Sequence, residues 1–513
     1  MTLHESSEYA GNEAMKEQIR KKTPFDEYTE KLTEEEQNTV RDFFDEFSAH
    51  CKMQKRETEK LRRDFENAVL YYASAGIPLE KALELLDIRH LGGFYARPAV
   101  QWYALDDAAK IYPLSMKRGR MAVFRLSVYL KEPVVPQLLQ MALNFTIKRF
   151  PSFATTVKKG FFWHYLDTAR IRYTVLQETG IPCQPLNIAA SASQTFRILW
   201  HQNRISAEFF HILTDGSGGM AFLKALTAEY LRLCGVNSCE EGLMKRDDIP
   251  EAEEAANMFV RPEAAEKSGG FADQPAVQMS GALSRIKPCR VLHFNMKAED
   301  VKRAAKQLDA TVTVYILSKI FLAVKEATDE LEGDVSVQIP VNMRKFYPSR
   351  TVRNFSLYCG IRFPVPQIKD TAEFVHRTAQ QLSEKSTREA MDEMMNSAGR
   401  LVWSLRFVPL VFKVPAAKSL YGFFTDGIFS TVLSNIGAVS MPEGYAEHID
   451  HMDFVLGTTG LNRAQCSVVT FNGIVSLSIS KQTADPTFEE ALYRLLAADG
   501  IIPEVEGSPV YES

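Results

Sequence analysis

One histidine in this sequence is followed, four residues later, by an aspartate and a glycine. These residues are His211, Asp215 and Gly216, in the run His-Ile-Leu-Thr-Asp-Gly. A neutral imidazole can accept a proton near pH 7, because its unperturbed pKa is about 6.5. Asp215 could brace the turn through a salt bridge or orient the ring, and Gly216 permits backbone conformations that side chains forbid. The run therefore predicts a general base at His211, with Asp215 and Gly216 supporting its loop.

The elements around the motif place His211 at the end of a strand. Residues 204–211 alternate so that Ile205, Ala207 and Phe209 share one face with His211. A turn through residues 215–219 then leads into an amphipathic helix. Catalytic side chains favour such strand ends, because the strand aims them while the loop leaves them reachable. A half-buried histidine at an ordinary strand–turn–helix junction would show the same six residues, so the motif alone does not decide.

The rest of the chain indicates two similar halves. Residues 1–97 are charged and helical in pattern, and we expect them to form an N-terminal helical extension. Strands and helices alternate through residues 98–235, the first lobe. Residues 236–288 are rich in Glu, Asp, Ala, Gly and Pro and predict a connecting segment. The strand–helix order restarts in residues 289–513, so the sequence predicts an α/β protein of two lobes.

Composition narrows the classes of function. The 513 residues carry 60 Lys and Arg against 64 Asp and Glu, a net charge of -4. Nucleic-acid binders usually need a basic excess, so we expect no nucleic-acid partner. The seven cysteines form no C-x-x-C pair, and we expect neither a metal site nor a disulfide framework. With no apolar N-terminal leader and no long apolar run, the sequence predicts a cytoplasmic protein.

Two later segments strengthen the interpretation of His211. Residues 340–344 read Pro-Val-Asn-Met-Arg, and residues 433–437 read Leu-Ser-Asn-Ile-Gly. With the histidine motif, they make residues 100–500 similar to the superfamily of CoA-dependent acyltransferases built on the chloramphenicol acetyltransferase fold. That superfamily includes condensation domains, wax ester synthases and alcohol acetyltransferases, and the bacterial alcohol-acetyltransferase-like proteins look closest. Its motif is H-H-x-x-x-D-G, and Phe210 replaces the first histidine here.

The resemblance implies roles for further residues. An arginine of the 340–344 type pairs with the motif aspartate, which makes Arg344 the expected partner of Asp215 and Arg353 the second choice. The Ser-Asn pair of the family lies near the reacting carbonyl. Ser434 and Asn435 are therefore the expected donors to the substrate or oxyanion.

The same resemblance implies a fold and an activity. It predicts two chloramphenicol acetyltransferase-like lobes with an active-site channel between them. The activity would be an acyltransferase of the EC 2.3.1 class, alcohol O-acetyltransferase-like. It would move an acyl group, such as acetyl, from a CoA thioester to an alcohol or amine. Acyl-CoA would be a co-substrate with no bound cofactor, and an acyl-carrier protein is an alternative donor. Because Phe210 replaces the first histidine of the family motif, an alternative remains: a catalytically silent protein that binds an acyl chain or a partner protein.

Two other stretches attract attention. Residues 448–453 (His-Ile-Asp-His-Met-Asp) are dense in metal-ligand types, but their alternation along a strand keeps them from converging, and we expect a solvated strand entry. Residues 399–424 combine aromatic side chains with Arg400, Arg406, Lys413 and Lys418. A core helix with charged ends is the favoured interpretation. A membrane-surface segment, or the mouth of a lipid-lined tunnel, is the alternative.

Overall fold

The computed structural model divides the chain into two compact units, residues 1–98 and 99–513. The structure describes residues 22–96, 101–107, 109–110, 121–169, 171–187, 194–259, 274–413, 415, 427–458, 460 and 462–511. The predicted boundary between extension and first lobe therefore lies outside the described residues.

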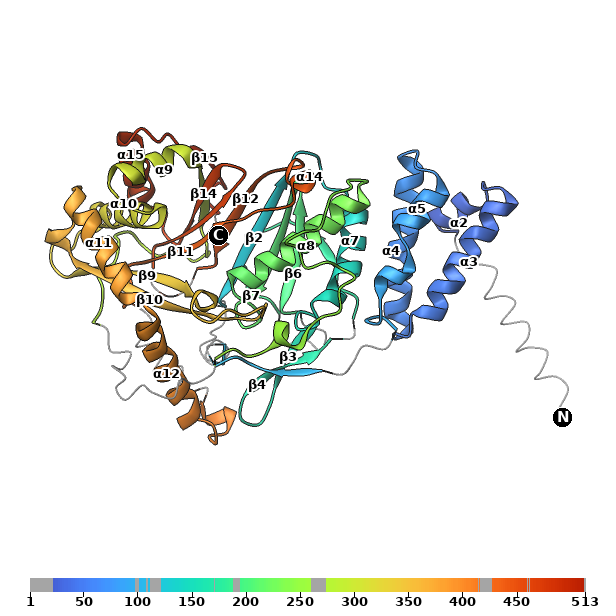
Figure 1. Cartoon of the computed structure of the whole chain (residues 1–513), viewed down its shortest axis with the longest axis horizontal. Helices are drawn as coiled ribbons and strands as arrows, with labels where there is room; N and C mark the ends of the chain where they lie inside the picture. The colour runs from blue at the N-terminus through green and yellow to red at the C-terminus, as the bar shows by residue number, and fades with distance from the viewer. Residues whose placement is uncertain are drawn as a thin grey trace. The chain divides into compact units, whose positions relative to one another are not determined.

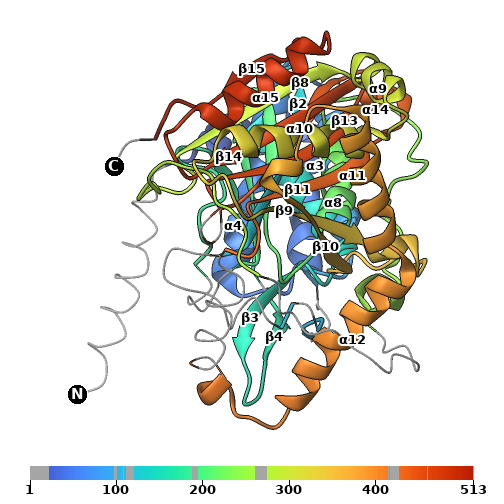
Figure 2. The same cartoon turned by 90° about the vertical axis from the view of Figure 1, so that its left-hand side faces the viewer.

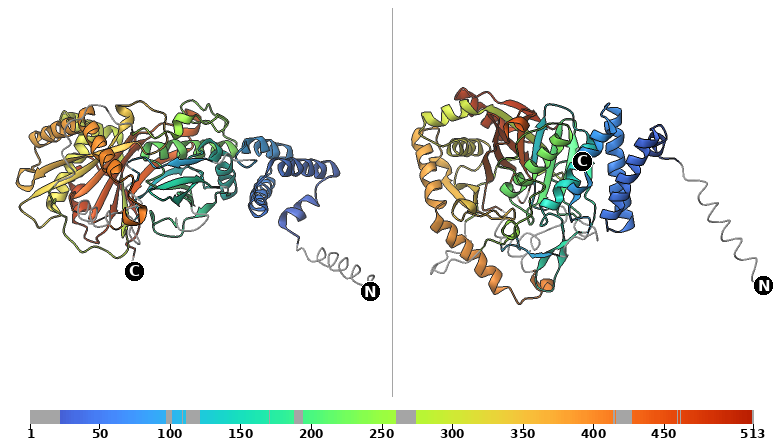
Figure 3. Two further views of the ribbon diagram at one scale, coloured as in Figure 1. Left: turned by 90° about the horizontal axis from the view of Figure 1, so that it is seen from below. Right: turned by 45° about the vertical axis from the view of Figure 1, so that its right-hand side comes forward.

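The N-terminal unit is helical in its described part, as its charge pattern indicates. Its helices are α2 (Pro24–Thr29), α3 (Glu34–His50), α4 (Lys55–Ser74), α5 (Leu79–Leu85) and the 3-10 turn η1 (Ile88–Leu91), drawn in blue in Figure 3. Thr33 begins α3 with a reciprocal capping box to Glu36. Phe44 and Phe47 pack edge-to-face with each other, and Phe47 packs the same way on Phe65. These rings form a small core internal to the unit.

The first lobe is built on a five-stranded sheet with helices against one face (Figure 1). The strand order is β12 (Ile449–Leu456), β2 (Val123–Leu130), β7 (Arg204–Phe210), β6 (Phe196–His201) and β5 (Val175–Gln177). Helices α7 (Pro136–Thr146) and α8 (Gly216–Leu233) pack on it. Phe209 of β7 meets Phe222 of α8 with ring centroids 6.0 Å apart. Alternating apolar residues on β7 thus produce the packed face that the sequence predicts.

The second lobe is built on a seven-stranded sheet. Its order is β10 (Ser356–Pro364), β9 (Asp334–Asn342), β11 (Thr431–Ala438), β13 (Ala464–Phe471), β14 (Ile474–Lys481), β8 (Arg290–Lys297) and β15 (Glu504–Gly507). The helices of this lobe are α9 (Ala298–Gln307), α10 (Val312–Glu326), α11 (Ala372–Lys385), α12 (Arg388–Ser404) and α15 (Thr487–Ala498). The short helix α14 (Glu443–Ala446) instead contacts β12 of the first lobe's sheet. Val475, Leu477 and Ile479 of β14 share one apolar core with α10 and α15. The α/β class and the two sheet lobes of the prediction are confirmed.

The opposite face of β13 and β14 is lined with serines. Ser476, Ser478 and Ser480 alternate with the core residues of β14 and are all buried. Ser480 Oγ donates to the carbonyl of Leu456 at 2.6 Å, and Ser467 of β13 donates to the carbonyl of Phe454. Both acceptors belong to β12. Small side chains on this face let β12 approach closely, and their hydroxyls satisfy its backbone.

Strand β12 therefore links the lobes. It lies within residues 289–513, yet it pairs antiparallel with β2 at the edge of the first lobe's sheet. The division by sequence order assigned it to the second lobe. The periodicity of apolar residues shows that a segment forms a strand, but it does not show to which sheet the strand belongs. The connecting segment expected at residues 236–288 has one short 3-10 turn, η3 (Ala252–Ala255), in its described part.

Two expectations about helices need correction. Helix α8 begins at Gly216, not after Gly219, because Asp215 caps it and the glycines make up its first turn. Residues 399–424 do not form a core helix in their described part. Trp403, Phe407 and Phe412 are 51%, 72% and 68% exposed. Residues 414 and 416–424 lie outside the described part.

A third, small sheet of order β1 (Trp102–Ala104), β4 (His164–Thr168) and β3 (Thr155–Lys159) completes the larger unit. Among the described residues, no single helix is long and apolar enough to cross a membrane. The pair α9 and α10 meets that test only when taken together, with an 81° bend between them.

Candidate functional site

His211 directly follows β7, which ends at Phe210. Its backbone N–H donates to the carbonyl of Ala122 at 2.8 Å, so the residue is held where β2 begins. The imidazole packs edge-on against Phe124, with ring centroids 5.3 Å apart. Phe124 also packs on Phe209, on the face that the alternation of β7 assigns to His211. The side chain is half-buried, and a rigid strand end sets its direction.

The surroundings of His211 favour its neutral form. Burial lowers the pKa of the imidazole, because a charged ring loses solvation there. Its own backbone and the negative charge of Asp215 oppose this effect more weakly. An unprotonated imidazole at neutral pH is the state that a proton acceptor requires.

Asp215 uses both carboxylate oxygens in structural bonds. Oδ1 accepts from the backbone N–H of Gly218 at 3.0 Å and so caps α8. Oδ2 accepts from Arg344 Nη1 and from the backbone N–H of Phe355, both at 2.7 Å. With these bonds made, Asp215 braces the loop between the two lobes.

Arg344 ties this loop to the second lobe. It lies in the 3-10 turn η4 (Met343–Lys345), directly after β9. Beyond Asp215, its guanidinium donates to the carbonyls of Thr351 and Arg353, at 2.8 Å and 2.7 Å from Nη2. Arg353, the second choice of partner for Asp215, instead forms an ion pair with buried Asp106 at 3.2 Å. The planar guanidinium of Arg344 can satisfy these acceptors at once.

The glycines of the motif are needed for space. A Cβ at Gly218 would lie 2.0 Å from the carbonyl oxygen of Val352, and one at Gly216 would lie 3.2 Å from Ile436. Gly216 has no positive φ, so its role differs from the conformational freedom that the sequence suggests. Thr214 Oγ1 also donates to the Val352 carbonyl, at 2.6 Å. The loop after His211 is in direct contact with the second lobe.

Ser434 and Asn435 lie on opposite faces of β11. Asn435 Nδ2 donates to Thr313 of α10 at 2.9 Å, and its Oδ1 accepts from the backbone N–H of Gly437 at 2.8 Å. Ser434 aligns with Ser467 in the parallel pair β11–β13, and Ser467 donates to β12 of the first lobe's sheet. Paired residues of neighbouring strands project to the same face, so half-buried Ser434 shares the face directed toward the first lobe. The amide of Asn435 instead joins β11 to its covering helix.

Sequence reasoning missed several residues that complete this arrangement. Phe355 supplies a backbone N–H to Asp215, and Asn354 Nδ2 donates to the carbonyl of His211 at 3.3 Å. Asn342 bridges Ser217 and Arg344. The bonds of Phe355 and Asn354 involve backbone groups, and residue types do not show which backbone groups meet.

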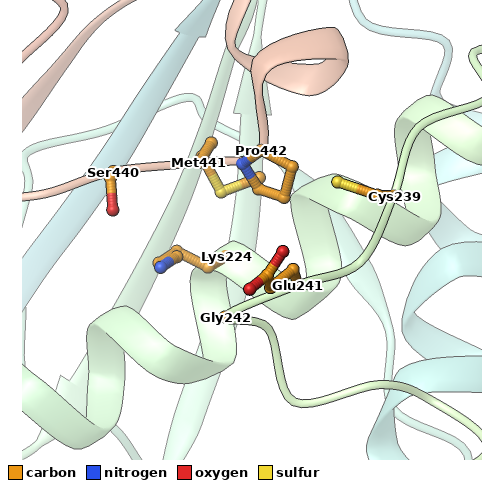
Figure 4. Close-up of a pocket in the computed structure, with 7 residues that line it drawn as sticks. All are labelled: Lys224, Cys239, Glu241, Gly242, Ser440, Met441 and Pro442. Carbon is orange, nitrogen blue, oxygen red and sulfur yellow. The ribbon is translucent and has the colours of Figure 1, made fainter.

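A pocket of about 220 Å³ lies beside α8 (Figure 4). Lys224 and Glu241 line it opposite Met441 and Pro442, with Cys239, Gly242 and Ser440 completing the wall. Lys224 lies eight residues after Gly216, about 12 Å along the helix at 1.5 Å per residue. The pocket is therefore separate from His211, although residues 440–442 continue the chain from β11.

The cluster at residues 448–453 is not a solvated strand entry. Within the described ranges, no group of three or more His, Cys, Asp or Glu residues is arranged to hold a metal ion. His451 stacks on Tyr129 with centroids 4.0 Å apart, and buried Asp453 accepts from the Tyr129 hydroxyl at 2.8 Å. His293 of β8 lies 3.7 Å from the same carboxylate. The cluster belongs to the buried seam where β12 meets both sheets.

Comparison with known proteins gives a match in structure but not in sequence. No protein-family model and no curated protein matches the chain. Among solved structures, TRI101 of Fusarium sporotrichioides, complexed with coenzyme A and T-2, is 13% identical with a TM-score of 0.53. That match covers 76% of this chain and 97% of the other. The chain shares the two-lobed fold of that structure.

Two further structures share this fold. The trichothecene 15-O-acetyltransferase TRI3 of the same fungus is 13% identical, with a TM-score of 0.51 over 77% of this chain and 94% of that chain. The first condensation domain of the calcium-dependent antibiotic synthetase is 12% identical, with a TM-score of 0.50 over 79% and 99%. At these identities the likeness establishes the fold, and substrates have to be argued from the site.

Asp215→Ala should lower the free energy of unfolding by about 3–5 kcal/mol, because it leaves the Arg344 charge without its carboxylate and α8 without its cap. Urea denaturation followed by circular dichroism measures this change. Glu490→Ala, at an exposed position of α15, is the matched control and should stay within about 0.5 kcal/mol of wild type. Equal stability of the two variants would contradict a bracing role for Asp215.

Proposed function

We propose that this protein is an acyltransferase in which His211 is the general base. The observation that carries the proposal is a half-buried imidazole of lowered pKa at a strand end, beside an aspartate whose oxygens are already used. His211 is then the proton acceptor of the motif, and Asp215 and Arg344 hold its loop. The acyltransferase fold of the chain supports the reaction class.

The proposed reaction is direct transfer from a thioester. His211 takes a proton from an alcohol or amine, whose oxygen or nitrogen attacks the thioester carbonyl and forms a tetrahedral oxyanion. Collapse of that intermediate breaks the carbon–sulfur bond. The proton on His211 then passes to the departing thiolate, so an ester or amide and a free thiol result. Neither a covalent acyl-enzyme nor a metal takes part in this scheme.

Ser434 is the proposed oxyanion donor. Its face of β11 is directed toward the first lobe, and Ile436 on the same strand comes next to Gly216 of the motif loop. A hydroxyl there would donate to the negative oxygen as it forms. The channel for donor and acceptor would run between the lobes at this point.

The acyl donor we propose is acyl-CoA, and an acyl-carrier protein is the alternative. The coenzyme A in the TRI101 structure supports the first, and the likeness to a condensation domain keeps the second open. We keep the cytoplasmic location as a prediction from the sequence.

His211→Ala should lower acyl transfer by roughly a hundred- to ten-thousandfold, because the acceptor loses its base. Purified protein would be incubated with acetyl-CoA and a panel of alcohols and amines, and released CoA would be read with a thiol reagent. Exposed Cys234 and Cys239 require a blank without substrate. His201→Ala, at an exposed histidine ending β6, is the matched control and should keep full activity. Full turnover in His211→Ala would refute the mechanism, and no release by wild type with any pair would favour the catalytically silent alternative.

The acid limb of kcat/KM should have its midpoint below pH 6.5. Burial lowers the pKa of His211, so the imidazole stays neutral to a lower pH than a free histidine. The rate should be flat from about pH 7 to 8 and fall only as the pH drops through the lowered pKa. Initial rates across this range, with folding checked by circular dichroism at each pH, test the expectation. A midpoint above 6.5 would contradict it.

Ser434→Ala and Asn435→Ala should differ in kind. Loss of an oxyanion donor should lower kcat by roughly a hundred- to a thousandfold at unchanged stability. Asn435→Ala should lower stability by about 1–3 kcal/mol, because Thr313 and the Gly437 N–H lose their partner. Its kcat per folded molecule should stay near wild type. Melting temperature and kcat measured on both variants separate the roles, and the reverse pattern would assign the oxyanion to Asn435.

A further inference from the structure

Large apolar side chains gather at one place on the larger unit. We name as the aromatic patch the exposed apolar residues of the β3–β4 turn and of the chain at and after the end of α12. The backbones of these two segments lie near each other in Figure 2. The exposed fractions of the patch residues are 72% for Phe161, 51% for Trp403, 72% for Phe407, 76% for Val411 and 68% for Phe412. Exposed apolar residues scattered singly are ordinary, but a contiguous group of this size marks an interaction surface.

The two segments of the patch are held together by hydrogen bonds, although about 250 residues separate them in the sequence. Leu410 donates its N–H to the carbonyl of Phe161 at 2.9 Å. Lys413 Nζ donates to the carbonyl of Phe162 at 2.9 Å and lies 3.5 Å from the centre of the Trp163 ring. Lys413 is 1% exposed, so its side chain joins the two segments from inside the protein. The backbone that carries the exposed rings is therefore fixed by these bonds.

The charge of the patch is one-sided. Residues 158–164 and 399–413 contain no Asp or Glu, although the whole chain has a net charge of -4. Their exposed or half-exposed cations include Lys159 and Arg406. The guanidinium of Arg406 lies 3.5 Å from the centre of the Trp403 ring and 4.5 Å from that of Phe407. Nearby Asp107 is bonded to Lys110 at 2.6 Å, so its charge is neutralised.

We propose that the aromatic patch binds the surface of a membrane that contains anionic lipid. Aromatic rings favour the headgroup level of a bilayer, and cations beside them are attracted to negative headgroups. The rings of the patch stand out from a hairpin turn and a helix end, so they can enter the headgroup layer without a complementary groove in a partner. This is attachment to one leaflet. The proposal is independent of the role of His211.

The patch revises the interpretation of residues 399–424. A stretch that combines aromatic side chains with cations more often forms a core helix with charged ends. The exposure of Trp403, Phe407 and Phe412 supports the membrane-surface alternative instead.

Co-sedimentation of the full chain with vesicles tests the proposal. Vesicles of phosphatidylcholine alone are compared with vesicles of equal parts phosphatidylcholine and phosphatidylglycerol. Wild type should bind the mixed vesicles more tightly, and added salt should weaken that excess. Phe407→Ser with Phe412→Ser should lower the partition coefficient at least about tenfold, because both rings leave the interface. Arg406→Gln should lower it about fivefold on mixed vesicles only.

The matched control removes apolar side chains exposed elsewhere. Ile249→Ser with Leu331→Ser changes two side chains that are 87% and 79% exposed, and should bind like wild type. All the altered positions are exposed or half-exposed, so melting temperatures should not move. Two results would overturn the proposal. One is wild type failing to bind the mixed vesicles, as expected if the patch serves a protein partner. The other is equal binding by the aromatic double variant and the control.

Discussion

The carboxylate of Asp215 is the interaction on which the rest of the site depends. It caps α8 of the first lobe and accepts from Arg344 and the backbone of Phe355 in the second. Three bonds to one buried group set the start of the helix, the loop that carries His211 and the approach of the second lobe together. A buried charge without its partner is costly, so this arrangement resists partial opening. In the proposed mechanism, the proton transfer at His211 is separate from the bonds by which Asp215 joins the two lobes.

A second constraint comes from the small polar face of the second lobe's sheet. Serines of β13 and β14 let β12 lie close, and β12 in turn extends the first lobe's sheet beside β2. Ser434 belongs to the same face of the sheet, one strand further along. The face that joins the lobes thus also presents a hydroxyl on the side of the motif loop. The histidine, the brace and this hydroxyl come from three distant stretches of sequence.

Much of the architecture follows from local pattern. Alternation along residues 204–211 predicted β7, and the amphipathic pattern that follows predicted α8, because these signals depend on near neighbours. Two expectations were wrong for a shared reason. Residues 448–453 lie mostly in a buried strand, and Phe407 and Phe412 are exposed. In each case the deciding neighbour lies elsewhere in the chain, where composition and periodicity carry no information.

The sequence by itself determined the α/β class, the strand-end position of His211 and the residue types that could form a base and its brace. These features arise from spacing along one segment, which residue chemistry dictates directly. The tertiary structure decided that the carboxylate of Asp215 bonds to Arg344 of the second lobe. It also decided that β12 joins the first lobe's sheet, and that Ser434 and not Asn435 faces that lobe. These are contacts between distant segments, and they depend on packing of the whole fold, which no single stretch of residues specifies.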